Sequence, residues 1–270
     1  MHENRPFHHR IVYGDTLYSL AKKYHTTVHD ILHANHNLNP YNLQIGSVIN
    51  IVPGHNFEGG HMHGHHTPAH PHTSQHHTVI PPHNIHTGPE TCVSQGEVDL
   101  NKEMRLAWSQ HVYWTRLLIV SIVAGLKDVD EVTNRVLRTA TDIAQSFAPY
   151  YGPEVEAAIQ KLLTEHLVIG KNLIVAANDK NAEDVAKYNK LWYENADQIA
   201  ELFSEISPTH FPKEEVRRMF RKHLDLTKEE LTYRLLGKYK EDIEAFGRIE
   251  EEALMMADFF TNRSSRAIFP

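Results

Sequence analysis

The sequence has little cysteine: Cys92 is the single one among 270 residues. One cysteine forms no intramolecular disulfide, and it cannot build a cysteine-based zinc site. It also falls in a stretch whose composition is that of a linker. We therefore expect a free thiol and a fold that does not depend on a disulfide framework.

Long apolar runs are missing as well. The longest, residues 117–125, is far shorter than the ~20 residues that a bilayer-spanning helix requires. Residues 1–6 lack the continuous apolar core of a secretory signal peptide. We therefore expect no membrane span and no signal-dependent export.

Positive charge is scarcer than negative charge. Lys and Arg number 27 against 34 Asp and Glu, which gives a formal net charge of -7 at pH 7. Binding to nucleic acid needs a basic surface that displaces counterions from phosphates. We expect no nucleic-acid partner, whereas neutral or acidic glycans remain open. The 41% of hydrophobic residues is ordinary for a globular protein and predicts a packed core.

Histidine, by contrast, is abundant and unevenly distributed. Of 22 histidines, seven precede residue 54, eleven lie within 54–94 and four follow. Because an unperturbed imidazole titrates near pH ~6.5, the first third of the chain becomes strongly cationic in mild acid. This distribution divides the chain into three parts, which we place at 9–53, 54–97 and 98–270.

Residues 9–53 have the pattern strand, helix, helix, strand. The predicted segments are a β-prone run at 9–13, a helix at 17–24 capped by Thr16, a short helix at 28–35 capped by Thr27, and a second β-prone run at 48–52. On the first helix the apolar face comprises Leu17, Leu20, Ala21 and Tyr24. This part is therefore predicted to be a small α+β module.

Two separated motifs carry a resemblance to a known family. The stretch Ile11-Val12-Tyr13-Gly14-Asp15-Thr16-Leu17-Tyr18-Ser19-Leu20-Ala21 resembles the opening of a LysM domain. The stretch from Asn35 to Asn39-Pro40, followed by Leu43-x-x-Gly46-x-x-Ile49-x-Ile51, resembles its closing half. The resemblance implies a compact β-α-α-β fold. It also implies binding of glycans that contain N-acetylglucosamine, such as peptidoglycan or chitin.

The same resemblance implies a shallow glycan-binding groove between two loops. The matching positions are Gly14, Asp15, Thr16 and Leu17 on one wall and Pro40, Leu43 and Ile45 on the other. Backbone amides and carbonyls there can pair with the N-acetyl group, and aliphatic side chains can cover its methyl. Two alternatives stay open: the residues around Gly14 only form a turn and a helix cap, or the module contacts a protein.

Residues 54–97 are predicted to be a flexible, disordered linker rich in histidine and proline, because they show no apolar periodicity. Its imidazoles are candidate ligands for zinc, nickel or copper without any preformed structure. The densest group consists of His61, His63, His65 and His66. The alternative is a solvated spacer whose histidines bind nothing.

Residues 98–270 are predicted to form an all-α antiparallel bundle. The expected helices span 99–125, 128–147, 153–178, 181–206, 212–224 and 227–262. Pro153 suits the first turn of a helix, and Thr227 with Glu230 has the pattern of a capping box.

Each long helix of this region carries a polar residue on its apolar stripe, and these are His111, His166, Asn195 and Glu250. They could converge on a polar network or on a metal, with His111, His166 and Glu250 as the candidate ligands. The architecture weakly resembles ferritin-like bundles, yet the paired Glu-x-x-His motifs of that class are lacking. A hydrogen-bonded core network is the favoured interpretation.

No nucleophile elbow, phosphate loop or dinucleotide fingerprint is present. We therefore predict a non-enzymatic protein without a required cofactor, in which LysM anchors a helical scaffold to the bacterial cell or spore envelope. Envelope or spore coat proteins are the expected partners, and the spore coat or cortex region is the expected location, with the cytoplasm as the alternative. Two other hypotheses stay open: a metal-binding ferritin-like protein or enzyme anchored by LysM, and a cytosolic metal-responsive adaptor.

Overall fold

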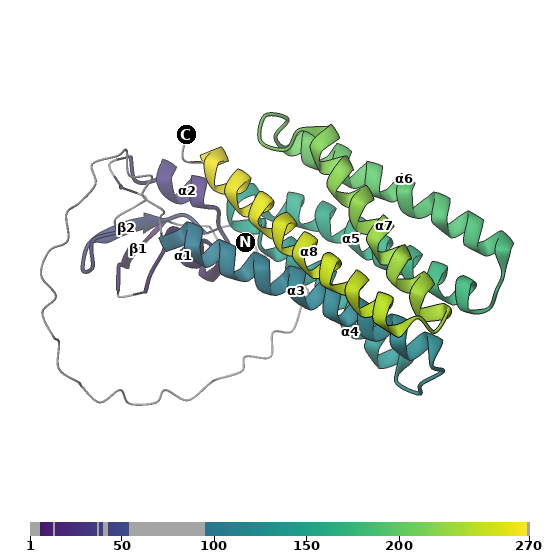
Figure 1. Cartoon of the computed structure of the whole chain (residues 1–270). Helices are drawn as coiled ribbons and strands as arrows, with labels where there is room; N and C mark the ends of the chain where they lie inside the picture. The colour runs from purple at the N-terminus through teal and green to yellow at the C-terminus, as the bar shows by residue number, and fades with distance from the viewer. Residues whose placement is uncertain (1–5, 13, 37, 40–42, 54–94, 269–270) are drawn as a thin grey trace, which may run out of the picture.

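The computed structural model describes residues 6–12, 14–36, 38–39, 43–53 and 95–268. It shows a small N-terminal module of strands and helices followed by an all-helical region, as predicted (Figure 1). The predicted linker falls almost entirely on residues 54–94, which lie outside the described residues.

Two short strands form the sheet of the N-terminal module. Strand β1 (Phe7–Arg10) pairs antiparallel with β2 (Val48–Ile51), with Phe7 opposite Ile51 and Arg10 opposite Val48. The prediction of a first strand at 9–13 was wrong in its bounds. The reason is that the Val12 amide donates to the Asp15 carboxylate, 2.8 Å away, instead of continuing the ladder.

Both predicted helix caps of the module are confirmed. Helix α1 (Leu17–Lys23) begins after Thr16, and α2 (Val28–His33) begins after Thr27. The Thr16 hydroxyl oxygen accepts from the Ser19 amide, and the Thr27 hydroxyl oxygen accepts from the Asp30 amide. These bonds satisfy amides that have no partner within the helix. Helix α2 packs against β2 and α1, and the buried residues of the module include Leu20, Ala21, Val28, Ile31, Ile49 and Ile51.

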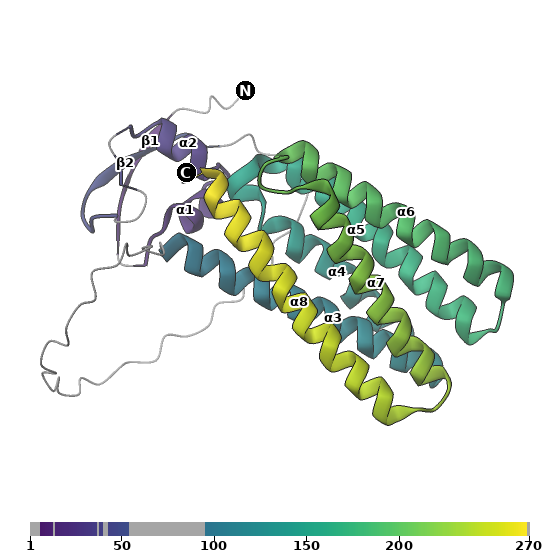
Figure 2. The same cartoon turned by 45° about the horizontal axis from the view of Figure 1, so that its top comes forward.

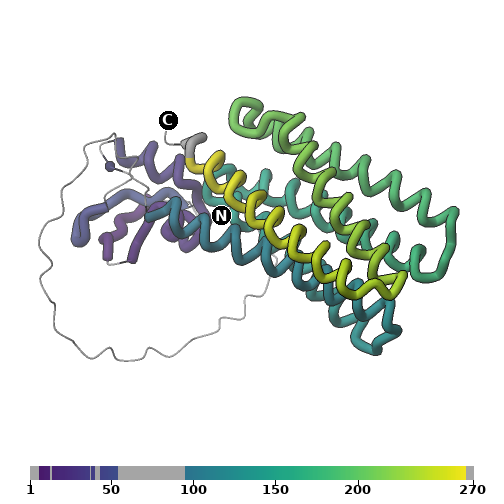
Figure 3. The backbone as a smooth tube through the Cα atoms, in the orientation of Figure 1, coloured from purple at the N-terminus to yellow at the C-terminus, as the bar shows by residue number. Residues whose placement is uncertain are grey.

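Six helices form the rest of the described chain. They are α3 (Gln95–Val123), α4 (Val129–Gln145), α5 (Ala148–Asn178), α6 (Ala182–Ile206), α7 (Lys213–Leu235) and α8 (Tyr239–Ile268). Each packs against the next in an up-and-down order, and α8 returns to pack against α3, so the helices form a closed ring (Figures 1 and 3). The predicted antiparallel bundle is confirmed.

The predicted helix over 227–262 is two helices. Thr227 does not cap a helix but lies buried within α7, where its hydroxyl donates to the His223 carbonyl. Glu230 is turned inward to Arg116 of α3. The chain reverses instead at Gly237, whose φ of +69° glycine adopts without a steric penalty.

Two glycines shape α5. Gly152 has a φ of +84° and interrupts the helix, so Pro153 begins the straight part, in the first-turn position that the sequence predicted. Further along, a Cβ on Gly170 would stand 3.2 Å from the indole of Trp192. A Cβ there would require Trp192 to shift by a few tenths of an ångström, because α5 and α6 approach closely at this level.

The N-terminal module packs on one end of the bundle (Figure 2). Tyr18 of α1 is buried, its ring stacks on Tyr150 of α5 at 5.7 Å, and its hydroxyl donates to Glu103 of α3 at 2.5 Å. Lys22 donates to the same carboxylate at 2.9 Å. The apolar cores of the module and the bundle are therefore continuous.

Gly237→Ala should destabilise the protein by about 1 kcal/mol, because alanine disfavours a positive φ. Gly247 is the matched control, since it lies within α8 with nothing near a built Cβ. Gly247→Ala should stabilise the protein by about 0.5–1 kcal/mol. Urea unfolding followed by circular dichroism measures both, and changes of equal sign would contradict the assigned turn.

Tyr18→Ala should cost about 3 kcal/mol, because it removes a buried ring together with a hydrogen bond between the module and the bundle. Tyr239 is 60% exposed, and Tyr239→Ala should change the free energy of unfolding by less than about 0.5 kcal/mol. The same urea titration compares the two variants. Equal costs would show that Tyr18 is not buried against α5 in solution.

Candidate functional site

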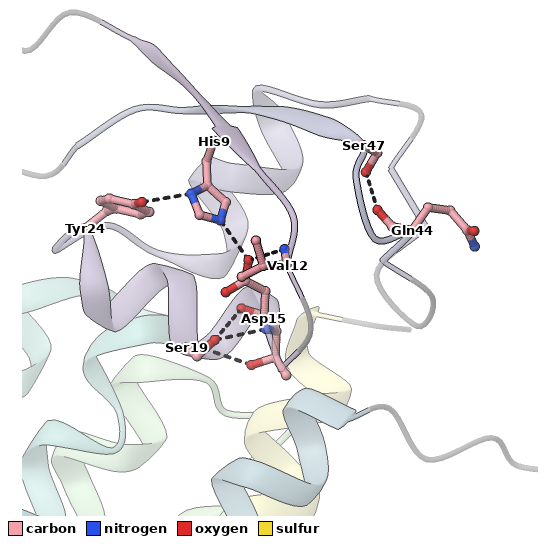
Figure 4. A network of polar contacts seen from close by, with 8 residues as sticks. His9, Val12, Asp15, Ser19, Tyr24, Gln44 and Ser47 are labelled. Carbon is pink, nitrogen blue, oxygen red and sulfur yellow. Dashed lines mark hydrogen bonds and ion pairs between the residues drawn. The ribbon is translucent and has the colours of Figure 1, made fainter. Parts of the chain in front are cut away.

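The turn after β1 is held by the carboxylate of Asp15. One of its oxygens accepts from the Val12 amide and from the His9 imidazole Nε2, each at 2.8 Å (Figure 4). Although burial raises the pKa of Asp15, these hydrogen bonds outweigh it, and the pKa lies below its ordinary value. The carboxylate thus fixes the shape of the turn.

The orientation of His9 is set by a further partner. The Tyr24 hydroxyl lies 2.8 Å from His9 Nδ1, so a neutral ring donates from Nε2 to Asp15 and accepts from Tyr24 at Nδ1. No sequence pattern indicates this chain of contacts. His9 had been placed on a β-prone run and Tyr24 on an apolar face, and no spacing rule connects them.

The predicted groove residues differ in their accessibility. Thr16 and Leu17 are buried, and the Thr16 hydroxyl accepts the capping hydrogen bond of α1. Both residues therefore support the turn that contains Gly14, and neither is open to a ligand. Gly14 is exposed, Asp15 and Leu43 are half-buried, and Ile45 is 67% exposed. Pro40 lies outside the described residues.

Hydrogen bonds join the chain segments that lie next to the two predicted walls. The Ile11 amide donates to the Ser47 carbonyl at 2.9 Å, and the Gly46 amide donates back to the Ile11 carbonyl at 2.8 Å. The Arg10 guanidinium donates to the Gly46 carbonyl at 2.7 Å. The segment that leads into the Gly14 turn is therefore bonded to the segment that follows Ile45.

These two turns offer a backbone and an apolar side chain to a ligand. Gly14 has a φ of +90°, and nothing lies within 4 Å of where a Cβ would stand, so its backbone is open to approach. The exposed Ile45 presents an aliphatic surface on the turn that precedes β2. This pair suits an N-acetyl group, which has a polar amide and an apolar methyl.

The bundle interior contains three buried histidines: His111 on α3, His166 on α5 and His223 on α7. The Nδ1 atom of each has a polar partner. The partners are Thr139 Oγ1 at 3.4 Å for His111, Asn195 Oδ1 at 2.7 Å for His166 and Glu252 Oε2 at 3.0 Å for His223. His111 and His223 also approach each other, with their Nε2 atoms 3.4 Å apart.

Placing Glu250 on the inner stripe of α8 was wrong. Its carboxylate accepts from the Tyr113 hydroxyl in an exposed contact, whereas Glu252 is buried beside His223. The reason is that α8 packs between α3 and α7, so its buried stripe runs through Ile249, Glu252 and Met256. No sequence pattern singled out His223, which lies near the end of the helix predicted at 212–224.

Burial determines the protonation state of two of these histidines. Desolvation lowers the pKa of His166 to about 3 and that of His111 well below its ordinary value, so both rings are neutral near pH 7. Two cavities, of about 10 and 30 Å³, are both lined by His111, His166 and His223.

The structure gives no complete set of metal ligands. Within the described ranges, no group of three or more His, Cys, Asp or Glu side chains is arranged to hold a metal ion. The predicted linker ligands His61, His63, His65 and His66 fall outside those ranges. None of the helices in the described residues has the length and hydrophobicity that a membrane span needs.

Comparison with known families identifies the N-terminal module. Residues 9–52 match the family model of the LysM domain, as the two motifs predicted. No curated protein and no solved structure matches the chain significantly. The LysM match supports binding of glycans that contain N-acetylglucosamine.

Asp15→Asn should lower the free energy of unfolding at pH 7 by about 1–2 kcal/mol, because it weakens two hydrogen bonds to a charged acceptor. The folded pKa of Asp15 is depressed, so its contribution is present above about pH 4 and is lost as the pH falls through the folded pKa. The difference from wild type should therefore shrink at pH 3.

The control for this prediction is Asp128→Asn. Asp128 precedes α4, is exposed and makes no side-chain cap hydrogen bond. Its replacement should leave the free energy of unfolding almost unchanged at both pH values, as urea titrations of the full chain will show. A cost for Asp15→Asn that is the same at pH 3 and pH 7 would rule out the charged contact.

Proposed function

Because residues 9–52 match the LysM domain, we propose that this module binds peptidoglycan or a chitin-type glycan through the surface formed by its Gly14 and Ile45 turns. The observation that carries the proposal is the accessibility of this surface. Gly14 leaves its backbone uncovered and Ile45 is 67% exposed, while Thr16 and Leu17 are buried beneath.

Docking of the module on the bundle supports this assignment. The face of α1 that carries Tyr18 and Lys22 contacts α3 and α5, so it is occupied within the chain. The turns at Gly14 and Ile45 stay exposed in the presence of the bundle. A long glycan chain can therefore reach them without displacing a helix.

We further propose that the bundle acts without catalysis, as a scaffold or a partner-binding part. The LysM match supports an association with the cell envelope, and a bacterial spore coat or cortex is our finer assignment. Fractionation of sporulating cells checks that assignment. Recovery of the protein only outside the spore fraction would reject it.

Ile45→Asn should weaken glycan binding about tenfold, because it removes an apolar contact and exposes a polar amide in its place. Ile243 is the matched control, since it is 61% exposed on α8 of the bundle. Ile243→Asn should leave binding unchanged.

The measurement is co-sedimentation of the full chain with purified peptidoglycan and, separately, with chitin. Circular dichroism of both variants shows whether the fold is kept. The expected result is loss of binding in Ile45→Asn alone. Binding by Ile45→Asn equal to that of wild type would remove the proposed surface, and equal loss in both variants would show that the exposed isoleucine is not its centre.

A further inference from the structure

A chain of four buried side chains crosses the bundle from α4 to α8. It runs from Thr139 to His111, then to His223, and ends at Glu252. The three contacts are 3.4 Å between Thr139 Oγ1 and His111 Nδ1, 3.4 Å between the two Nε2 atoms, and 3.0 Å between His223 Nδ1 and Glu252 Oε2. All four side chains are buried.

The hydrogens available for these contacts can be counted. The Thr139 hydroxyl donates to the Val136 carbonyl at 2.6 Å, so its oxygen can only accept from His111. At the other end a carboxylate accepts as well. In the tautomers that carry their N–H on Nδ1, His111 donates to Thr139 and His223 donates to Glu252. In these tautomers the two Nε2 lone pairs face each other across 3.4 Å.

A cation between the Nε2 atoms would resolve this arrangement. It would bind both lone pairs, and it would balance the negative charge that Glu252 brings into the interior. Two imidazoles on one tetrahedral zinc-like ion, at Zn–N distances of about 2.0–2.1 Å, have nitrogens about 3.3–3.4 Å apart. The observed separation of 3.4 Å has that value.

We propose that His111 and His223 bind one divalent transition-metal ion of the zinc class through their Nε2 atoms. Imidazole nitrogen suits zinc, cobalt, nickel and copper. Glu252 does not ligate the ion but accepts from His223 Nδ1, as carboxylates do behind metal-binding histidines. Both ligands come from this chain, and the remaining positions belong to small ligands.

The surroundings leave room for such ligands. The cavity of about 30 Å³ beside His111, His166 and His223 is large enough for one water molecule. Polar atoms around the two cavities have no partner within the described residues: Trp108 Nε1, Thr115 Oγ1 and Trp192 Nε1. A metal-bound water or anion would give these donors an acceptor. Two protein ligands with such small ligands also agree with the absence of a three-residue ligand set in the described chain.

The test uses the full chain, stripped with a chelator and then loaded with Co²⁺. The chain also carries exposed histidines, so the bound metal is measured after a brief wash with a weak competing chelator, which removes exposed ions first. We expect one protected equivalent with the visible absorption of four-coordinate Co²⁺. His111→Gln and His223→Gln should each lose it.

The matched control is the double variant His29→Gln with His33→Gln, whose exposed rings stack on α2 at 6.2 Å. It should keep the protected equivalent. No protected Co²⁺ in wild type, or full retention in His223→Gln, would overturn the proposal, and an extra proton between the rings would then be the cation.

A second measurement does not depend on the folding of a variant. In crystals of Co²⁺-loaded wild type, anomalous scattering locates the ion directly. We expect a peak between the Nε2 atoms of His111 and His223. Peaks only at surface histidines would overturn the proposal.

Discussion

Polar side chains that are buried inside a closed ring of helices can form hydrogen bonds and ion pairs only with other groups in that ring. The bundle obeys this constraint at several levels. Asn195 of α6 is hydrogen-bonded to His166 of α5, and Glu252 of α8 is hydrogen-bonded to His223 of α7. Nearer the far end, Arg116 of α3 donates to Asp242 of α8 at 2.8 Å. Because each pair joins two different helices, the pairs fix how the helices are rotated and shifted against one another.

The sequence predicted those elements whose cause is local. The caps Thr16 and Thr27 act through amides three residues away, so their pattern is visible without any tertiary structure. The boundary between α7 and α8 was missed for the opposite reason. A threonine followed by a glutamate three positions later fits a capping box, and only the contact of Glu230 with the distant Arg116 shows that it lies mid-helix. Similarly, which of two nearby glutamates faces inward on α8 depends on the helices that flank it.

The candidate sites divide in the same way. Motifs located the turns of the LysM module, because these turns are made by neighbouring residues. They did not separate Gly14 and Ile45, which are accessible, from Thr16 and Leu17, which are buried. Tyr18 lies off the apolar face of its own helix, so nothing in the module alone indicates that the bundle covers it. His223 becomes a candidate site residue only because it lies beside His111, which is far away in sequence.

The contact at Tyr18 joins two parts of one polypeptide, and this changes how strong it has to be. Two separate proteins that met through one stacked tyrosine and a shared carboxylate would lose more translational freedom than such a contact returns. Within a single chain, docking is intramolecular, so each part faces the other at a high effective concentration. Residues 54–94 join the two parts covalently, so docking carries no cost of bringing two separate molecules together.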